Sequence, residues 1–266
     1  MRTEQITSAQ NPKIRNLLLL QEKSRARREQ GLFVVEGRRE LSHCVEAGFT
    51  VRTLFVCPEL SGEDFSASLK MTGEVPLIVE IPETLYRKVA YRESTEGVIA
   101  EVEAKERTLE DLQPGERPLI VVLESVEKPG NLGAVLRSAD AARADAVIVC
   151  DPLTDLYNPN LIRSSIGAVF TVPTVLASTP EAIAWLKERG IRILTAQLQD
   201  SEWYYHTDMT GGTALVMGTE STGLTQEWRE AADAHIKIPM LGRLDSLNVS
   251  VSAAILLFEA VRQRNA

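Results

Sequence analysis

Cysteine is scarce in this chain of 266 residues, and it contains no long apolar run. The three cysteines, Cys44, Cys57 and Cys150, form no CxxC pair. Their odd number and apolar contexts indicate reduced core thiols rather than disulfides or metal ligands. No apolar run approaches the roughly 18 residues that a membrane span needs, and the polar start MRTEQITSAQNPK has no signal-peptide core. We therefore expect a cytoplasmic protein with no metal site and no membrane contact.

The two common nucleotide-binding fingerprints are absent as well. No G-x-x-x-x-G-K-S/T stretch occurs, which excludes a P-loop. Asp151 follows Gly130 and Gly133 by about twenty residues, at the end of a strand-like run, as an acidic residue does in a dinucleotide site. The spacing is Gly130-x-x-Gly133, however, and no G-x-G-x-x-G exists. The sequence therefore disfavours a dinucleotide site and, with it, a small-molecule dehydrogenase.

Acidic residues outnumber basic ones, and the net charge of −8 argues against a protein that simply coats a polyanion. Residues 1–40 depart from this balance with nine Lys or Arg against five Asp or Glu, whereas residues 41–117 hold eight against fifteen. Most of these basic residues lie in KIRNLLLLQEKSRARR. This basic segment is either a local contact for nucleic acid or the solvated side of an amphipathic helix.

The first hundred residues alternate between helix and strand patterns, with Gly just past helices and Pro just inside them. The helix patterns cover residues 11–31, 38–48, 63–71 and 82–91. The strand patterns cover residues 32–37, 51–57, 76–80 and 97–103. These elements predict a small α/β domain in residues 1–106. A charged stretch with Pro and Gly but little apolar periodicity follows, so we expect a linker at residues 107–117.

Residues 118–266 predict a second α/β domain with a mostly parallel sheet. Its strand-like runs are continuous and apolar, as is typical of strands buried on both faces. They cover residues 119–125, 146–150, 172–176, 191–198, 213–218 and 235–240. Helices are expected to begin near Asn131, Asn160, Pro180, Thr225 and Ser246. Ligands bind beyond the carboxyl ends of the strands in such sheets, so the loops after the strands form the candidate site.

The first of these loops belongs to the stretch LESVEKPGNLGAVLRSADAA. Asn131 can cap the helix that opens there. Gly133 lies inside the first turn, where Gly is less stable than Ala, and so indicates a close approach of backbone or ligand. Arg137 comes six residues after Asn131. Taken alone, this pattern also fits a capped helix with a surface arginine.

The second loop lies in ALVMGTESTGLTQEW, where Gly218 ends a strand and Gly223 precedes a helix. Two glycines this close allow a sharp turn or the approach of backbone to a ligand. The N–H groups of the loop could then bind the polar edges of an adenosyl group. An ordinary strand–turn–helix with an exposed Glu220 is the alternative.

The third loop lies in IKIPMLGRLDSLNVSVSAAILLFEAVRQR, which reads as strand, loop and helix. An apolar stripe at helical spacing predicts the core-facing side of this helix. The stripe consists of Leu247, Val251, Ala254, Ile255 and Phe258. Ser246 can cap the helix, and Asn248 and Ser250 then lie in its first turn, off the stripe. These polar residues either complete a capped core helix or line a site.

Together the three loops resemble, in order, the motifs of the SpoU/TrmH family of RNA ribose 2'-O-methyltransferases, which belongs to the SPOUT superfamily. The matching elements are Asn-x-Gly-x-x-x-Arg, Gly-x-Glu-x-x-Gly, and Ile-Pro-Met with Ser-Leu-Asn-Val-Ser. The likeness covers residues 118–266. Through LFVVEGRRELSHCVEAG and VRTLFV, the first domain resembles the ribosomal-protein-like substrate-binding domain often fused ahead of it. Lys128 departs from the family pattern at a position that bears on substrate preference.

This resemblance implies a deep trefoil knot in the second domain, S-adenosyl-L-methionine as the cofactor, and a homodimer formed through the C-terminal domain. It places these residues at the cofactor: Thr195, Ala196, Met217, Gly218, Gly223, Ile238 and Leu247. It places these around the reacting ribose: Asn131, Arg137, Glu220, Ser246 and Asn248. The role of Arg137 stays open between general base, oxyanion stabiliser and phosphate clamp, because Arg remains protonated at ordinary pH.

The implied substrate is a structured RNA, recognised by shape and 2'-hydroxyls. Ribosomal RNA is favoured over transfer RNA because the first domain resembles a ribosomal-protein module. We expect the RNA contacts at Lys23, Arg25, Arg27, Arg28, Arg38 and Arg39. The alternatives are a tRNA ribose methyltransferase, a base methyltransferase of the same superfamily, and a catalytically inactive RNA-binding or ribosome-assembly factor.

Overall fold

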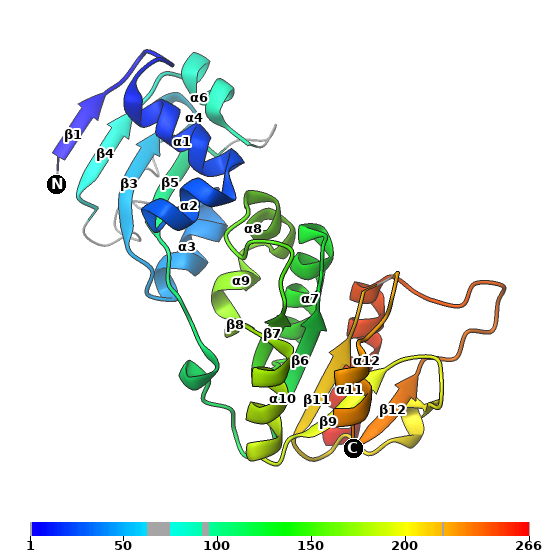
Figure 1. Ribbon diagram of the computed structural model, residues 1–266. Coiled ribbons are helices and arrows are strands. Elements are labelled where there is room, and N and C mark those ends of the chain that lie inside the picture. Colours follow the sequence, from blue (N-terminus) through cyan, green and yellow to red (C-terminus); the bar gives the residue numbers. More distant parts are fainter. Residues whose placement is uncertain (1, 63–74, 92–95, 220, 266) are drawn as a thin grey trace. The chain divides into compact units, whose positions relative to one another are not determined.

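The computed structural model describes residues 2–62, 75–91, 96–219 and 221–265, and the chain forms two compact units (Figure 1). The first unit is Met1–Glu106 together with Asp155–Thr171. The second unit is Arg107–Thr154 together with Val172–Ala266. The second half of the chain therefore contributes a segment to the first unit. The helix expected at residues 63–71 lies outside the described residues.

A mixed sheet of five strands forms the centre of the first unit. The strands are β1 (Arg2–Gln5), β2 (Leu32–Glu36), β3 (Val51–Val56), β4 (Leu77–Glu80) and β5 (Val98–Glu103). Their order is β1-β4-β3-β5-β2, and β5 runs antiparallel to both of its neighbours (Figure 1). The sequence predicts every strand of this sheet except β1. Its residues RTEQ are mostly exposed at the edge of the sheet and therefore carry no apolar alternation.

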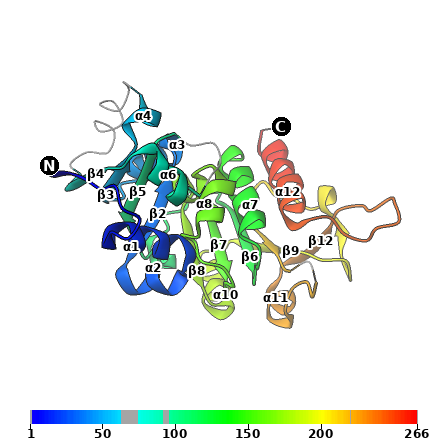
Figure 2. The same ribbon diagram turned by 90° about the horizontal axis from the view of Figure 1, so that it is seen from above.

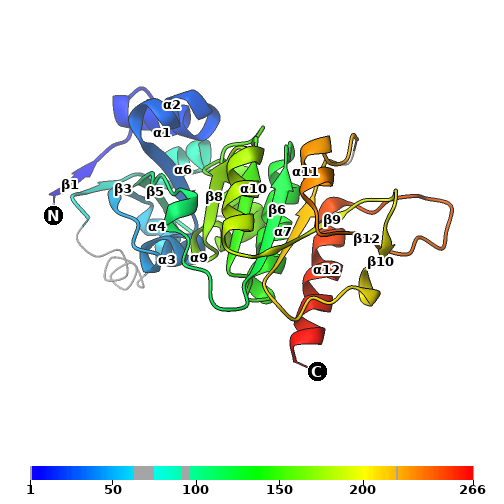
Figure 3. The ribbon, with the colours of Figure 1, turned by 60° about the horizontal axis from the view of Figure 1, so that its bottom comes forward.

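The basic segment near the N-terminus forms two helices instead of the single predicted one (Figure 3). α1 (Pro12–Glu22) and α2 (Ser24–Gln30) are separated by Lys23, whose backbone is extended at φ −111° and ψ 110°. Gly31 ends α2 with a left-handed φ of 62°. The fully buried residues of α1 are Ile14, Leu17 and Leu20. The amphipathic-helix interpretation of this segment is confirmed.

Residues Asp155–Thr171 complete the first unit. They form α8 (Pro159–Ser165) and α9 (Ala168–Thr171), which join the helices α3 (Arg38–Glu46), α4 (Pro58–Ser61) and α6 (Glu83–Val89). The buried Arg27 donates from Nε to Asp155 at 2.7 Å. The Tyr157 ring stacks on Phe33 with ring centroids 4.2 Å apart, and its hydroxyl donates to the carbonyl of Lys105 at 2.6 Å. An ion pair and an aromatic stack thus hold a distant segment against this sheet.

The second unit is built on a sheet of seven strands, all parallel, as the continuous apolar runs predict. The strands are β6 (Leu119–Glu124), β7 (Ala146–Cys150), β8 (Thr174–Ala177), β9 (Arg192–Ala196), β10 (Glu202–Trp203), β11 (Thr213–Met217) and β12 (Ala234–Lys237). Their order is β10-β12-β9-β11-β6-β7-β8. Only β10 is not predicted, because two residues are too few to show a pattern.

Helices cover both faces of this sheet (Figure 2). α7 (Pro129–Ala141) and α12 (Val249–Arg264) lie side by side on one face, and α10 (Thr179–Glu188) and α11 (Gln226–Ala231) lie on the other. Trp185 of α10 and Trp228 of α11 pack into one cluster with Ile120, Ile148 and Ile193 of the strands. Burial of both faces explains why the strands are apolar throughout.

The stretch expected to be a linker is fastened to the second unit. A short 3-10 helix, Leu109–Asp111, is closed by a capping box in which Thr108 and Asp111 bind each other's backbone N–H groups. Asp145 accepts hydrogen bonds from the N–H groups of Gly115, at 3.2 Å, and Leu119, at 2.7 Å. The entry to β6 is therefore held by one carboxylate.

The last helix turns a different side to the core than its periodicity predicts. Its buried residues are Val249, Ala253, Leu256, Leu257, Glu259 and Ala260. Val251 and Phe258 of the predicted core stripe are 46% and 48% exposed, and Ala254 and Ile255 are half-buried. The prediction fails because α12 is apolar on nearly all sides, so the pattern does not reveal which side faces the sheet.

Candidate functional site

A cavity of about 390 Å³ lies where β9, β11 and β12 end. Three chain segments line it: residues 196–199 at the end of β9, residues 217–219 and 221–224 at the end of β11, and residues 236–238, 240 and 245–247 from the end of β12 to the start of α12. Arg229 of α11 and Val249, Ser252 and Leu256 of α12 also line it. Its position at the carboxyl ends of parallel strands is the one expected for a ligand site in an open sheet. The loop from β12 to α12 extends away from the sheet (Figure 1).

The shape of the loop after β11 depends on two glycines. A Cβ on Gly218 would fall on the carbonyl of Gly223 and lie 2.6 Å from the backbone nitrogen of Leu224. Thr219 and Gly223 pair across the turn, with the N–H of Gly223 donating to the carbonyl of Thr219 at 3.1 Å. Gly223 has a φ of 68°, which favours glycine. The first glycine is therefore required by backbone contact, and the second by backbone conformation.

Most of the expected cofactor residues line this cavity. Those that do are Ala196, Met217, Gly218, Gly223, Ile238 and Leu247. Thr195 is not among the described lining residues. It is fully buried, and its hydroxyl lies 2.6 Å from Nδ1 of His235. Side chains alternate along β9, so Thr195 and Ala196 point to opposite faces of the sheet.

The structure brings the first and third motifs together. Asn248 donates from Nδ2 to Oδ1 of Asn131 at 3.1 Å, which joins the starts of α12 and α7. Asn248 also accepts the N–H of Ser250 at 2.9 Å and is the N-cap of α12. Ser246, the predicted cap, instead lines the cavity, and its hydroxyl donates to Asp245 at 3.3 Å.

Two other predicted features of the reacting site differ from expectation. Asn131 does not cap α7, because Lys128 occupies the N-cap position and Pro129 the first helical position. Asn131 therefore lies inside the helix, and its side-chain oxygen accepts a hydrogen bond from Asn248 instead of capping α7. Glu220 lies outside the described residues.

Arg137 is exposed on α7 and is not among the described residues that line the cavity. An α-helix turns about 100° per residue, so six residues separate Arg137 from Asn131 by about 120° around the helix axis. The two side chains consequently leave α7 in different directions. The spacing in the sequence does not bring Arg137 to the cavity within one chain.

Sequence reasoning missed the charged residues of the cavity wall, which are Arg229, Lys237 and Asp245. Arg229 belongs to α11 and is half-buried. Its Nε is fully buried and has no hydrogen-bond partner within the part of the chain that the structure describes. No local pattern distinguishes these residues from surface charges, because their placement depends on how the loops fold.

A buried carboxylate, also missed, positions the start of α11. Glu124 ends β6 and is only 2% exposed. It accepts the N–H of Thr225 at 2.9 Å and the hydroxyl of Thr225 at 2.7 Å. The hydroxyl of Thr179 lies 3.3 Å from the same carboxylate, so Glu124 joins the starts of α10 and α11 to the sheet. The loop from Gly218 to Thr225 is thereby anchored at its far end.

The expected RNA-binding residues of the first unit divide into two groups. Those that are exposed are Lys23, Arg25, Arg28 and Arg39. Arg27 is 4% exposed and is bound to Asp155 and to the carbonyl of Leu20, so its guanidinium does not face solvent. Arg38 is half-buried and donates to the carbonyl of Ser61. Arg27 is therefore a structural residue, which corrects its assignment to the RNA surface.

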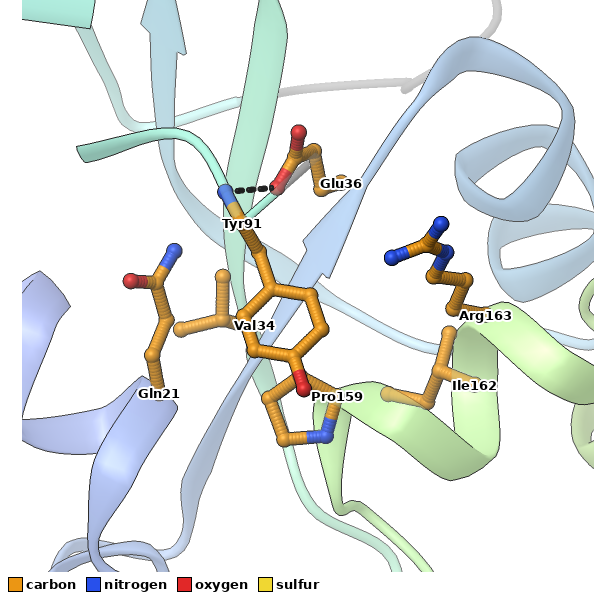
Figure 4. Close-up of a pocket in the computed structure, with 7 residues that line it drawn as sticks. All are labelled: Gln21, Val34, Glu36, Tyr91, Pro159, Ile162 and Arg163. Carbon is orange, nitrogen blue, oxygen red and sulfur yellow. Dashed lines mark hydrogen bonds between the residues drawn. The ribbon is translucent and has the colours of Figure 1, made fainter. Parts of the chain in front are cut away.

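A second cavity lies in the first unit, between α1, β2 and α8 (Figure 4). Tyr91 and Pro159 both line it, and the N–H of Tyr91 donates to the buried Glu36 at 2.7 Å. The cavity measures only about 10 Å³, enough for about one water molecule. Of the two cavities described here, only that of the second unit has room for a cofactor.

The cysteines are buried free thiols, as predicted. Burial, together with a hydrogen bond to Glu59, raises the pKa of Cys57 to about 11, so this thiol stays protonated at neutral pH. Among the described residues, no group of three or more His, Cys, Asp or Glu is arranged to hold a metal ion. None of the described helices combines the length and apolarity needed to cross a membrane.

Comparison with known families gives one match for each domain. Residues 118–258 match the model described as the SpoU rRNA Methylase family, and residues 11–100 match the MRM3-like substrate binding domain. A 23S rRNA (uridine(2479)-2'-O)-methyltransferase of Streptomyces viridochromogenes is 34% identical over 245 residues. The alignment covers 90% of this chain and 85% of that protein.

Solved structures show the same likeness. An AdoMet-bound rRNA methyltransferase from Sinorhizobium meliloti superposes with a TM-score of 0.88 at 30% identity, and covers 98% of both chains. A TrmH/SpoU tRNA modifying enzyme of A. aeolicus is also 30% identical, but it matches only 59% of this chain, with a TM-score of 0.50. The similarity to the rRNA enzyme therefore spans both units.

Proposed function

The chain belongs to the SpoU rRNA methylase family, and from this premise we propose that it transfers a methyl group from S-adenosylmethionine to a ribose 2'-hydroxyl of 23S rRNA. The observation that carries the proposal is the 390 Å³ cavity, in which the second and third family motifs meet at the ends of β11 and β12. Membership of the family also implies the trefoil knot through which these segments pass. The likeness to the rRNA methyltransferase from Sinorhizobium meliloti covers 98% of both chains and so includes the sequence of both units.

The cavity suits S-adenosylmethionine in size and lining. Its volume falls in the range of about 300 to 1,000 Å³ that is usual for such ligands. Apolar side chains such as Leu247 and Ile238 can pack against an adenine ring, and backbone groups of the segments after β9, β11 and β12 can bind its polar edge. The two glycines of the loop after β11 bring its backbone close to the ligand. We propose the lining residues of the second and third motifs, together with those at the end of β9, as the cofactor site.

The cofactor supplies an activated sulfonium methyl group, so the residues of this chain have to position the ribose and assist loss of the 2'-hydroxyl proton. We propose that Asn131, Asn248 and Ser246 hold the ribose, because the first two are hydrogen-bonded to each other and the third lines the cavity. Amide and hydroxyl groups can both donate to and accept from a ribose hydroxyl. Glu220 is proposed to act in the same place on the motif alone.

Arg137 is proposed to act on the RNA and not on the cofactor. It is exposed, it does not line the described cavity, and a guanidinium stays protonated at ordinary pH. A phosphate clamp needs a charged, exposed fork of donors, whereas a general base needs a group that can give up its proton. Of the three roles left open, the clamp agrees best with its placement.

Ribosomal RNA is the proposed substrate class because the likeness includes the first unit. The alignment with the relative from Streptomyces viridochromogenes, named for 23S rRNA, covers 90% of this chain, whereas that with the tRNA-modifying structure covers 59%. The exposed basic residues Lys23, Arg25, Arg28 and Arg39 are proposed RNA contacts on this unit. The buried free thiols agree with a reducing compartment, and we propose the cytoplasm as the place of action.

We further propose a homodimer formed through the C-terminal unit. The exposed side of α12 carries Val251 and Phe258, with Ala254 and Ile255 between them. Side chains seven residues apart lie on one side of a helix, so these residues form a continuous apolar strip. Exposed apolar surface of this kind marks an interaction site.

The test is methyl transfer from radiolabelled S-adenosylmethionine to ribosomal and transfer RNA that lack the modification, followed by alkaline hydrolysis. A ribose 2'-O-methyl group prevents cleavage of its own phosphodiester. We therefore expect label in alkali-resistant dinucleotides from 23S rRNA. Arg137→Ala is the matched inactive variant: it should lose transfer while its affinity for S-adenosylhomocysteine stays unchanged.

The alternatives predict different distributions of label. Label in ordinary mononucleotides would show a base methyltransferase, and resistant label from transfer RNA alone would show a tRNA enzyme. Binding of RNA without transfer to any fraction would support an inactive assembly factor. Normal turnover by the Arg137 variant would remove this residue from the site.

A further inference from the structure

Arg229 differs from a surface arginine because part of its guanidinium is buried in the wall of the cavity. It is half-buried on α11, its side chain lines the cavity, and its Nε is fully buried without a hydrogen-bond partner in the described chain. One guanidinium nitrogen, Nη2, lies 3.9 Å from the point where a Cβ on Gly223 would be. The guanidinium therefore lies beside the turn that Thr219 and Gly223 close.

The unpaired Nε–H of Arg229 lowers the stability of the folded protein. A buried donor that loses its hydrogen bond destabilises a protein, and the loss is larger if the group is charged. Native proteins satisfy most buried donors, and those that they leave unsatisfied call for a functional explanation. Glu124 and Asp245, which are carboxylates near the same loops, are bound to Thr225 and to Ser246 respectively. Because Nε is enclosed by protein, a ligand reaches Arg229 through the terminal guanidinium nitrogens, and neither of these carboxylates occupies them.

The chemistry of the cofactor identifies the acceptor. The charged residues among the described cavity lining are Arg229, Lys237 and Asp245. S-adenosylmethionine carries two cationic groups, the sulfonium and the α-ammonium, and a single anionic group, the α-carboxylate. A guanidinium repels the first two and matches a carboxylate with two parallel N–H donors. We propose, on the basis of the function proposed above, that Arg229 binds the α-carboxylate of the cofactor's amino-acid part.

This contact would make Arg229 a specificity-determining residue. It would distinguish S-adenosylmethionine and S-adenosylhomocysteine from adenosine derivatives that have no amino-acid part. The adenosine part contacts the three loops, whereas the amino-acid part reaches the turn at Gly223 through Arg229. Loss of the guanidinium should therefore weaken only ligands that carry the carboxylate.

The experiment compares two ligands by isothermal titration calorimetry. S-adenosylhomocysteine carries the carboxylate, and 5'-methylthioadenosine has the same adenosine and thioether but no amino-acid part. The variants are Arg229→Gln, Arg229→Lys and Lys237→Gln, and the exposed Arg143→Gln is the charge control. For Arg229→Gln we expect a loss of about tenfold or more for S-adenosylhomocysteine, from the usual strength of charged hydrogen bonds, and unchanged binding of methylthioadenosine. The affinity of Arg229→Lys for S-adenosylhomocysteine should lie between those of the wild type and Arg229→Gln. Arg143→Gln should bind both ligands as the wild type does.

Each other outcome has a defined meaning. If Arg229→Gln loses affinity equally for both ligands, Arg229 only supports the turn. If it loses affinity for neither ligand, Arg229 does not contact the cofactor. Either result would overturn the proposal. A loss of discrimination in Lys237→Gln but not in Arg229→Gln would move the carboxylate to Lys237. If the wild type bound neither ligand, the proposed function itself would fail, and this result is distinct from the others.

Discussion

At the scale of single residues, the loop after β11 shows how backbone contact limits the choice of side chain. Gly218 touches the backbone of Gly223 and Leu224, so no side chain fits there. The nearby Glu124 holds the other end of the same loop through Thr225. The cofactor site therefore depends on a residue without a side chain and on a buried carboxylate, neither of which has to touch the ligand.

We expect Gly218→Ala to abolish tight cofactor binding. A methyl group at this position collides with the carbonyl of Gly223, so the turn has to open and the cavity wall moves. Affinity for S-adenosylhomocysteine should fall by about tenfold or more, because the loss of even one hydrogen bond to the displaced backbone costs about 1 kcal/mol. Titration calorimetry measures the effect. Gly211→Ala is the matched control, since a Cβ there meets nothing within 4 Å, and equal affinities for the two variants would contradict the argument.

Glu101 on β5 should make stability depend on pH. Burial raises the pKa of this carboxyl above its ordinary value of 4.5, so the folded state holds its proton more tightly than the unfolded state. Between the ordinary and the raised pKa the folded state binds more protons, and its stability therefore decreases as pH rises. Urea unfolding of wild type and Glu101→Gln over this window should show a decrease that the variant lacks. The exposed Glu110→Gln should behave like the wild type; an identical slope for Glu101→Gln would refute the assignment.

At the scale of elements, the segment that carries α8 and α9 is held in the first unit by α2. Arg27 is fully enclosed by Asp155 and by the carbonyls of Leu20 and Gln21. The stack of Tyr157 on Phe33 adds an aromatic contact beside it. A segment that belongs to the methyltransferase half of the sequence is thereby tied to the substrate-binding half.

We expect Arg27→Ala to destabilise the protein by about 3 to 5 kcal/mol, because it removes the cation from Asp155, whose side chain is only 16% exposed, and the donor from the carbonyls of Leu20 and Gln21. The double variant Arg27→Met with Asp155→Leu should recover much of this loss, since an apolar pair of similar volume carries no unpaired charge. Arg25→Ala is the control: its side chain is 84% exposed and forms an i,i+4 ion pair with Glu29, so its loss should cost about 0.5 kcal/mol or less. Urea unfolding compares the three. A double variant as unstable as the single one would show that packing, and not charge, dominates here.

At the scale of the whole molecule, an acidic protein has to bind a polyanion. The net charge is −8, yet the exposed basic residues of α1, α2 and α3 give the first unit a local surface that can contact phosphate. Truncating residues 1–30 is a poor test of this surface, because it removes Ile14, Leu17 and Leu20 from the core. Substitution of exposed charges leaves that core intact.

Replacing Lys23, Arg25, Arg28 and Arg39 by Gln should flatten the salt dependence of RNA affinity. Each phosphate contact contributes about 0.7 to 0.9 to the slope of log affinity against log salt. Filter binding of a 23S rRNA fragment at several salt concentrations measures this slope. Replacing Arg143 and Lys187, which are exposed in the second unit, is the control. The same slope in the quadruple variant and the wild type would place the RNA contacts elsewhere.

The apolar strip on α12 makes a prediction about assembly. Val251→Asp with Phe258→Asp should convert a dimer to a monomer, because two charges in an apolar contact lose their hydration. Both side chains are about half exposed, so the fold of one chain should persist. Light scattering after size exclusion gives the mass. Leu153→Asp, at a residue that is 65% exposed, should leave the mass unchanged. A wild-type protein with the mass of a monomer would contradict the proposed dimer.

The sequence by itself determined most elements of both units, the parallel sheet of the second unit, and the loops after β11 and β12 that line the cavity. Apolar periodicity, helix caps and glycines are local signals, and the family motifs are short enough to be read without a structure. The break between α1 and α2 at Lys23 and the strand β1 were not predicted, because a single extended residue and a polar edge strand show no apolar periodicity.

Only the tertiary structure decided which of these residues meet. It paired Asn131 with Asn248, turned the predicted core strip of α12 outward, buried Arg27 against Asp155, and placed Arg229 in the cavity while leaving Arg137 outside it. These outcomes depend on contacts between segments that are up to 128 residues apart in the chain. Local patterns cannot encode such contacts, because the direction of a side chain is set by the packing of its whole element.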